Sequence, residues 1–224
     1  MNNSELIEKA IKRIPRGKPF FAESVSSKYA ASITRSVLTR LIKKGGVARV
    51  ARGIYVRPKT SQYLKKGEYR LSWPQEIIRL ISKRTREVIV PCGATAENYV
   101  GLSTQIPVRP IYYTTGRSRT IEMSKGADIK LIHTNPKKIV MPGTIVCMVV
   151  TALWERRTKL IHPLLIKKIH NRLTSDEYAE VLKNLDKMPS WMRAAFVKYQ
   201  NMDPADQALE EDYFQGGCSG WPDE

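Results

Sequence analysis

The segment from residue 27 to residue 56 restricts the fold of this 224-residue chain more than any other. It reads SKYAASITRSVLTRLIKKGGVARVARGIYV. A basic stretch with helical periodicity is followed by two glycines and then by two short β-prone runs, 47–50 and 54–56, around a tight turn. This order of elements is typical of a winged helix-turn-helix, and it predicts that the N-terminal part of the chain binds DNA.

The predicted helix in this segment has two unlike sides at 100° per residue. Its apolar residues gather on one side, while hydroxyls, guanidinium groups and ammonium groups occupy the other, where they suit phosphate oxygens and base edges. We expect Ser32 to cap the helix and Gly45-Gly46 to end it. An amphipathic helix that faces only solvent is the alternative. The residues expected to face DNA are Ser32, Arg35, Ser36, Thr39, Arg40, Lys43 and Lys44 on the helix, and Arg49 and Arg52 on the ribbon.

The charge of the chain is unevenly distributed. The formal net charge is +17. Residues 1–72 carry 17 basic and 4 acidic side chains, residues 73–172 carry 17 and 6, and residues 173–224 carry 4 and 11. The basic first three-quarters suit a polyanion such as DNA, since binding releases counterions from phosphates. The acidic end suits a basic partner surface or the protein's own basic face.

The spacing of apolar residues predicts an α+β fold. In the N-terminal part we expect a helix over residues 4–14 and a short second helix that Phe20 and Phe21 open and that runs through Val25. Ser72-Trp73-Pro74 should start a further helix, with Ser72 as its cap and Pro74 in its first turn. The predicted organisation is a winged helix-turn-helix domain at 1–58, a linker at 59–72, a mixed α/β domain ending in helices at 73–202, and an acidic tail at 203–224.

Alternating strand-like and helix-like runs fill the predicted second domain. Turn signals separate the runs, notably Thr115-Gly116-Arg117 and Lys125-Gly126. The predicted strands are 87–91, 110–114, 119–123 and 129–133, and the predicted helices are 93–102, 145–157, 163–172, 175–185 and 190–199.

Several protein classes are disfavoured. The N-terminus does not resemble a signal peptide, and the longest apolar run, 145–153, is too short to span a bilayer. The cysteines Cys92, Cys147 and Cys218 form no metal-binding spacing. We therefore expect a cytoplasmic protein without metal or other cofactor and without a membrane partner.

Catalytic motifs are scarce. No phosphate-binding loop, dinucleotide fingerprint or nucleophile elbow is present. The nearest arrangement is that of a metal-dependent nuclease, with Glu97 or Glu122 beside the acid-x-Lys pair Asp128 and Lys130. We expect no enzyme, with the nuclease as a minor alternative. RNA binding is also less favoured, because the few aromatic residues form no stacking pattern.

Two segments together resemble a known family. They are LTRLIKKGGVARVARGIYVRP at 38–58 and VPCGATAENYVGLSTQIPVRPIYYTTGRSRTIEMSKGADIKLIHTNPKKI at 90–139. Both are similar to AbiEi-type antitoxins, the transcriptional-regulator component of type IV toxin–antitoxin and abortive-infection systems. The resemblance covers roughly residues 4–155, and the runs GLSTQ at 101–105 and TGRSR at 115–119 are its most particular part.

The resemblance implies a bacterial two-domain protein, a winged helix-turn-helix followed by an antitoxin domain. Such proteins repress their own operon through inverted repeats in its promoter and counteract a nucleotidyltransferase-like toxin, often without a stable complex. It also implies that the helix and ribbon residues named above contact DNA, and that Gln105, Arg117 and Arg119 match the family's polar motif, whose role is unassigned. The alternative mechanism is direct sequestration of the toxin by the C-terminal domain, with the acidic segment docking on a basic toxin surface.

Overall fold

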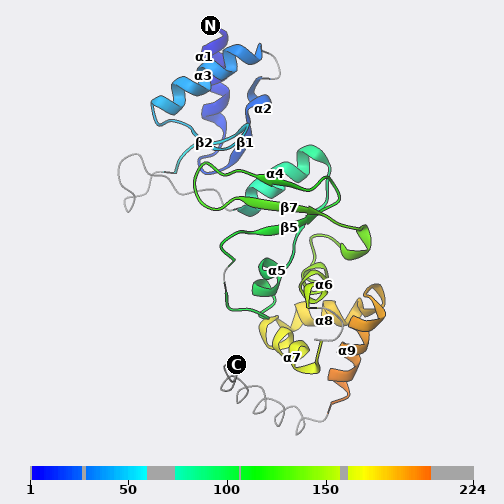
Figure 1. Ribbon diagram of the computed structural model, residues 1–224. Helices are drawn as coiled ribbons and strands as arrows, with labels where there is room; N and C mark the ends of the chain where they lie inside the picture. Colours follow the sequence, from blue (N-terminus) through cyan, green and yellow to red (C-terminus); the bar gives the residue numbers. More distant parts are fainter. Residues whose placement is uncertain (1, 27–28, 60–73, 106, 157–160, 203–224) are drawn as a thin grey trace, which may run out of the picture. The chain divides into compact units, whose positions relative to one another are not determined.

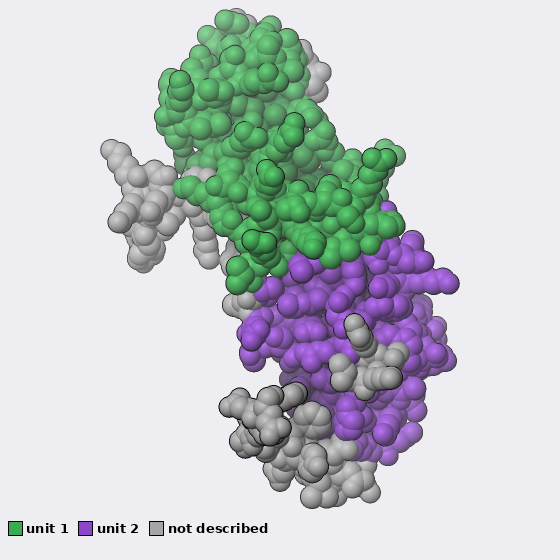
Figure 2. All heavy atoms as spheres, viewed as in Figure 1, with its two compact units in different colours: residues 1–89, 108–110, 116–133 green, residues 90–107, 111–115, 134–224 purple. Residues whose placement is uncertain are grey.

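The computed structural model describes residues 2–26, 29–59, 74–105, 107–156 and 161–202 (Figure 1). The chain is a mixed α+β protein with two small sheets, which agrees with the fold class predicted from the sequence. It divides into two compact units: unit 1 comprises residues 1–89, 108–110 and 116–133, and unit 2 the remainder (Figure 2). The domain limits expected from the sequence stay predictions. The Ser72 cap, residues 60–72 of the expected linker and the acidic tail lie outside the described residues.

Unit 1 begins with three helices and a small antiparallel sheet. In this sheet β3 lies between β1 and β2, with Phe20 opposite Tyr55 and Arg49 also opposite Tyr55. The elements are α1 Asn3–Arg13, β1 Pro19–Phe21, α2 Ala22–Ser26, α3 Ala31–Lys43, β2 Ala48–Ala51 and β3 Ile54–Val56.

Both faces of this sheet are covered. The Phe20 and Tyr55 rings lie 6.2 Å apart on the face that packs against α1, α2 and α3. Side chains alternate along a strand, so Phe21 points to the other face, where the guanidinium of Arg84 lies 4.3 Å from the centre of its ring. Arg84 belongs to α4, Pro74–Thr85, which lies on the side of the sheet away from α1 and α3 (Figure 1). Helix α4 buries Ile77, Ile78 and Ile81.

Two local predictions for this region are wrong. Phe20 and Phe21 do not open a helix but form β1, because both pair with β3 and Phe20 is buried in the core. Ser32 does not cap α3: the N-cap is Ala30, which has extended backbone and no side-chain cap, while its carbonyl accepts from the N–H groups of Ile33 and Thr34. Ser32 therefore lies inside the first turn of the helix, on its exposed side.

A ribbon from later in the chain also belongs to unit 1. Its strands are β6, Arg119–Ile121, and β7, Ile129–His133, which pair antiparallel with Thr120 opposite Lys130. After β6 the chain meets the edge of the N-terminal sheet: Met123 forms an isolated bridge with Ala51. The N–H of Ser124 donates to the carbonyl of Val50 at 2.9 Å. The outer edge of β2 is therefore not free.

Unit 2 is built mainly of helices around α6, Ile145–Glu155. Eight residues of this apolar helix are buried, and Leu153, Ile166 and Phe196 are among the most enclosed side chains of the core. Thr144 caps α6, and Thr174 with Glu177 forms a capping box at α8. The predicted helices of this region and the strand at 110–114 are confirmed, with bounds that differ by a few residues. The elements are β4 Ile89–Pro91 at the unit boundary, α5 Ala94–Tyr99, β5 Ile111–Thr114, the 3₁₀ turns Pro136–Lys138 and Leu185–Lys187, α6 Ile145–Glu155, α7 Pro163–Arg172, α8 Ser175–Lys183 and α9 Ser190–Gln200.

Candidate nucleic-acid interface

Helix α3 ends in a tight turn that leads directly into β2. The N–H of Gly45 donates to the carbonyl of Ile42 and the N–H of Gly46 to that of Leu41, both at 2.9 Å. These two bonds are those of a Schellman motif, which needs a left-handed residue after the helix. Gly45 supplies it with φ of +69°. The predicted end of the helix at the glycine pair is thus confirmed.

The two sides of α3 are those that the sequence predicts. Thr34, Val37 and Leu38 are buried against α1 and α2, although the Thr34 hydroxyl has no hydrogen-bond partner there. The opposite side is exposed at every position that was expected to face DNA, namely Ser32, Arg35, Ser36, Thr39, Arg40, Lys43 and Lys44.

The exposed groups on α3 differ in their partners. The hydroxyls of Ser36 and Thr39 donate to carbonyls one turn earlier in the same helix, at 3.1 and 2.9 Å. Among the described residues, the charged groups of Arg35, Lys43 and Lys44 have no protein partner. These three side chains can therefore donate hydrogen bonds to a ligand outside the protein.

Arg40 differs from its neighbours on the helix. Its Nη2 donates to Oε1 of Glu8 on α1, and the two form an ion pair. The side chain of Arg40 is 50% exposed and that of Glu8 is 27% exposed. Sequence periodicity could place Arg40 on the basic side of α3, but it gave no sign of this acidic partner 32 residues away.

The ribbon that carries Arg49 and Arg52 is short and sharply turned. Gly53 has φ of +76°, and the pairing of β2 with β3 shifts its register between Arg49 and Ala51. Arg49 is exposed, and its Nε donates to the carbonyl of Ala51 at 3.4 Å. Arg52 is exposed at the turn. Both arginines are thus accessible, as the sequence predicted.

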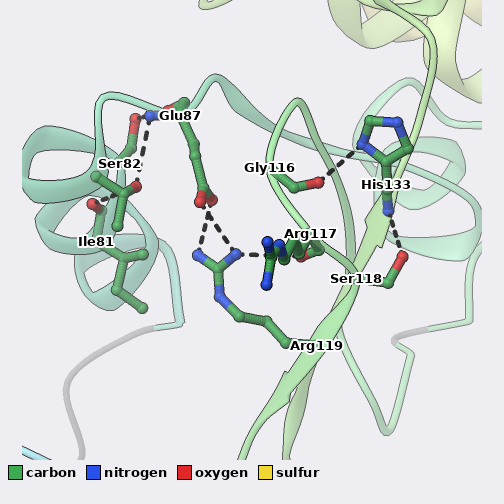
Figure 3. A network of polar contacts seen from close by, with 9 residues as sticks. Ile81, Ser82, Glu87, Gly116, Arg117, Ser118, Arg119 and His133 are labelled. Atoms are coloured by element: carbon green, nitrogen blue, oxygen red, sulfur yellow. Dashed lines mark hydrogen bonds and ion pairs between the residues drawn. The ribbon is translucent and has the colours of Figure 1, made fainter.

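Arg119 donates several hydrogen bonds in a polar network within unit 1 (Figure 3). Its Nη1 and Nη2 donate to the two carboxylate oxygens of Glu87, at 3.1 and 2.7 Å. Nη1 also donates to the carbonyl of Arg117 at 3.1 Å. Glu87 is held in turn, because the hydroxyl of Ser82 on α4 donates to its carbonyl at 2.6 Å. Arg119 therefore ties the ribbon to the end of α4, whereas the Arg117 side chain is exposed.

Gly116 has a steric reason to be glycine. A Cβ at this position would lie 2.1 Å from the carboxyl carbon of Glu87. The Gly116 carbonyl lies 2.8 Å from Nδ1 of His133, and the Ser118 hydroxyl accepts from the His133 N–H at 2.8 Å (Figure 3). The segment 116–119 thus fits closely against β7 and Glu87.

Gln105, the third member of the predicted polar motif, lies in unit 2. The amide of Asn98 donates to the carbonyls of Ser103 and Gln105, both at 3.2 Å. The chain leaves α5 through Gly101, which has φ of +78°. This run folds the end of α5 back on itself through its backbone, and the side chain of Gln105 is exposed.

Two of the three acids of the nuclease alternative, Glu97 and Asp128, are engaged elsewhere, and Glu122 is exposed. Glu97 accepts two hydrogen bonds from Arg156, at 2.9 and 3.0 Å. Asp128 accepts from the N–H of Met123 at 2.9 Å. Within the described ranges, no group of three or more His, Cys, Asp or Glu residues is placed to hold a metal ion. The expectation that the chain is not an enzyme remains a prediction.

One polar cluster in unit 2 could not be predicted from sequence patterns. The hydroxyl of Tyr113 donates to Glu155, and Nζ of Lys138 lies 5.5 Å from the centre of the Tyr113 ring and 5.3 Å from that of Trp154. Burial, and then the charge of Glu155, raise the pKa of Cys92 to about 12. Burial and the bond to Glu155 also raise the pKa of Tyr113. The Cys92 thiol is therefore protonated at neutral pH, which argues against a nucleophilic role.

The described residues thus form an α+β protein that exposes a cationic helix and a cationic ribbon from its N-terminal unit. Residues 6–182 match the model of a family described as a family of unknown function, DUF6088, and the chain belongs to that family. No curated protein matches the chain. In the part of the chain that the structure describes, no helix has both the length and the apolar character needed to cross a membrane.

Proposed function

We propose that this protein is a DNA-binding antitoxin that represses transcription of its own toxin–antitoxin operon. The observation that carries the proposal is the exposed cationic side of α3, on which Arg35, Lys43 and Lys44 lie free of protein partners within the described residues. The opposite side of the same helix is buried. A helix built in this way can enter a major groove without any rearrangement of its core.

The order of the N-terminal elements supports this assignment. Helix, strand, two helices and two strands follow one another, and the strands pair in the order β1-β3-β2. We propose that this unit is a winged helix-turn-helix, with α3 as the recognition helix and the β2–β3 turn as the wing. An arginine on α3 would form a bidentate contact with a guanine, while Arg49, Arg52 and the lysines would hold phosphates.

The proposed mode of action is occupancy of the promoter. One winged helix reads a short site, so two copies on inverted half-sites would add their contacts and raise specificity. In line with the resemblance to AbiEi-type antitoxins, the protein would act in the bacterial cytoplasm and counteract a nucleotidyltransferase-like toxin by limiting its expression. Direct sequestration of that toxin is the alternative.

The test of DNA binding is an affinity measurement on a duplex selected by the wild-type protein from a random library. The double variant Arg35→Ala with Lys43→Ala should bind this duplex at least about tenfold more weakly, because it loses two DNA-facing cations. The matched control is Arg193→Ala with Lys198→Ala, which removes the same two charge types from exposed positions on α9 in unit 2. Equal losses in the two double variants, or failure of the library to yield any bound duplex, would refute the proposal.

The antitoxin half of the proposal has a separate test. Expression of this protein should restore the growth of cells that also express a neighbouring nucleotidyltransferase-like gene. The double variant on α3 should no longer repress a reporter driven by the promoter that the two genes share. A stable one-to-one complex of the two proteins after purification, with growth restored by the α3 variant as well, would instead establish sequestration.

A further inference from the structure

The pairing of Glu8 with Arg40 joins two rigid elements of unit 1. Ile7 and Ile11 fix α1 in the core, and Val37 and Leu38 fix α3, each with 2% exposure or less. Glu8 and Arg40 are therefore presented by helices whose positions are set by buried neighbours. The contact between Nη2 and Oε1 leaves the guanidinium of Arg40 half exposed beside the cations that are proposed to meet DNA.

No other acid in the described part of residues 2–59 points at α3. Only three acidic residues occur there. Glu5 accepts from the N–H of Asn2 at the start of α1, and Glu23 pairs with Arg84 of α4 at 2.6 Å. Within residues 2–26 and 29–59, Glu8 is thus the one acid that pairs with a cation on the exposed side of α3, and it contacts one of the four cations there.

We propose that Glu8 is a positioning residue that makes Arg40 selective for a base rather than for phosphate, an inference that rests on the proposed DNA-binding function. A guanidinium without a carboxylate beside it can bind a phosphate of any sequence as well as a base edge, and the phosphate contact raises affinity without discrimination. A neighbouring carboxylate cancels that charge and holds the guanidinium in one orientation. One of its five N–H groups is used on Glu8, and the others can still bond O6 and N7 of a guanine.

The experiment compares Glu8→Gln with Glu23→Gln. Both variants remove one negative charge and one acidic partner of an arginine in unit 1, but only the first concerns Arg40. The probes are the duplex selected by the wild-type protein, the same duplex with each guanine in turn replaced by 7-deazaguanine, and a scrambled duplex of equal length. The deaza base lacks N7, so wild-type affinity should fall about tenfold at the guanine that Arg40 reads. Arg40→Ala should be insensitive at that position.

Glu8→Gln should bind the scrambled duplex about three- to tenfold more tightly than wild type, because the freed Arg40 attracts phosphate. It should also lose most of its sensitivity to the deaza guanine. Glu8→Asp keeps the negative charge on a shorter side chain. Its affinity for the scrambled duplex and its sensitivity to the deaza guanine should lie between those of wild type and Glu8→Gln. The discrimination between duplexes is the decisive readout, since a merely structural pair would change the unfolding temperature and leave that ratio intact.

Identical behaviour of Glu8→Gln and Glu23→Gln on all duplexes would overturn the role of Glu8 while DNA binding itself stands. Full sensitivity of Arg40→Ala to every deaza guanine would do the same. Failure of the wild-type protein to select any duplex would overturn the proposed function and the role of Glu8 together. Should Glu8→Gln fail to fold, Glu8→Asp against Glu23→Asp gives the same comparison with the charge retained.

Discussion

The arginines of α3 and of the β2–β3 turn differ from Arg119, although all come from short basic runs of sequence. Arg35 and Arg52 are exposed, and within the described residues their side chains contact no carboxylate. Arg119 donates to both oxygens of Glu87 and to a backbone carbonyl. Arg40 lies between these cases, half exposed but paired with Glu8. An arginine is thus available for a ligand or committed to the fold depending on whether a distant segment supplies an acid.

The largest expected effect on this contrast is that of salt. If the exposed cations neutralise about six to ten phosphates, DNA affinity should fall by about 10³- to 10⁵-fold between 50 and 200 mM salt. The reason is that the release of counterions from DNA favours binding less at higher salt. Binding of a labelled duplex across this range measures it. The free energy of unfolding of the free protein should change little over the same range, because the Glu87–Arg119 pair is partly buried. A salt-independent affinity would show that the exposed arginines do not contact phosphates.

The next largest effect concerns Arg119, the arginine that is bound to Glu87. Arg119→Ala should lower the free energy of unfolding by about 1–3 kcal/mol, because it removes the two hydrogen bonds that Arg119 donates to the Glu87 carboxylate, whose side chain is 19% exposed. Arg117→Ala is the matched control two residues away, and its side chain is exposed. It should stay within about 0.5 kcal/mol of wild type. Denaturant unfolding of the two variants checks the difference.

A double-mutant cycle sharpens the same point. Gly116→Ala should also destabilise the fold, since its Cβ would displace the Glu87 carboxylate that Arg119 holds. The combination with Arg119→Ala should then cost less than the two single changes together. Full additivity would mean that the glycine acts on something other than this ion pair.

Much of the N-terminal unit could be predicted because its signals are local. The apolar stripe of α3, the glycine pair at its end and the two β-prone runs are each visible within a few residues, and the structure has all three. The strand at Phe20 and Phe21 was missed because their partners in β3, Tyr55 and Ile54, lie 35 and 33 residues further on. The bridge from Met123 to Ala51 is equally remote. Pairings over such distances leave no periodic trace in the sequence.

The candidate site divides in the same way. Which residues of α3 are exposed followed from helical periodicity, and every predicted position is exposed. Which of them are free did not, because Glu8 reaches Arg40 from another helix. The resemblance singled out Arg117 and Arg119 together, yet one side chain is exposed and the other binds Glu87. A motif shows that a residue matters to the fold or to a ligand, and only its contacts distinguish the two.

A smaller effect is expected at the exposed Arg35. Arg35→Ala should weaken binding to the selected duplex about tenfold and relax preference at one base pair, since a bidentate contact is lost. Its free energy of unfolding should stay within about 0.5 kcal/mol of wild type, because the side chain is exposed and forms no hydrogen bond or ion pair with the described residues. Parallel binding and unfolding curves give both quantities. The opposite pattern, a loss of stability with unchanged binding, would place Arg35 with Arg119 and remove the contrast.

The smallest expected effect is that of Lys44→Ala. Lys44 is the C-cap of α3 and is exposed, so its ammonium can hold a phosphate but reads no base. Its loss should weaken all duplexes alike by about three- to sixfold at physiological salt and flatten the salt dependence by about one phosphate. Lys198→Ala is the matched control, since Lys198 lies in the last turn of α9 and shares any effect of the helix dipole. If Lys44→Ala changed the preference between duplexes while Lys198→Ala did not, Lys44 would be reading sequence, and an unpaired lysine on α3 could not be equated with a phosphate contact.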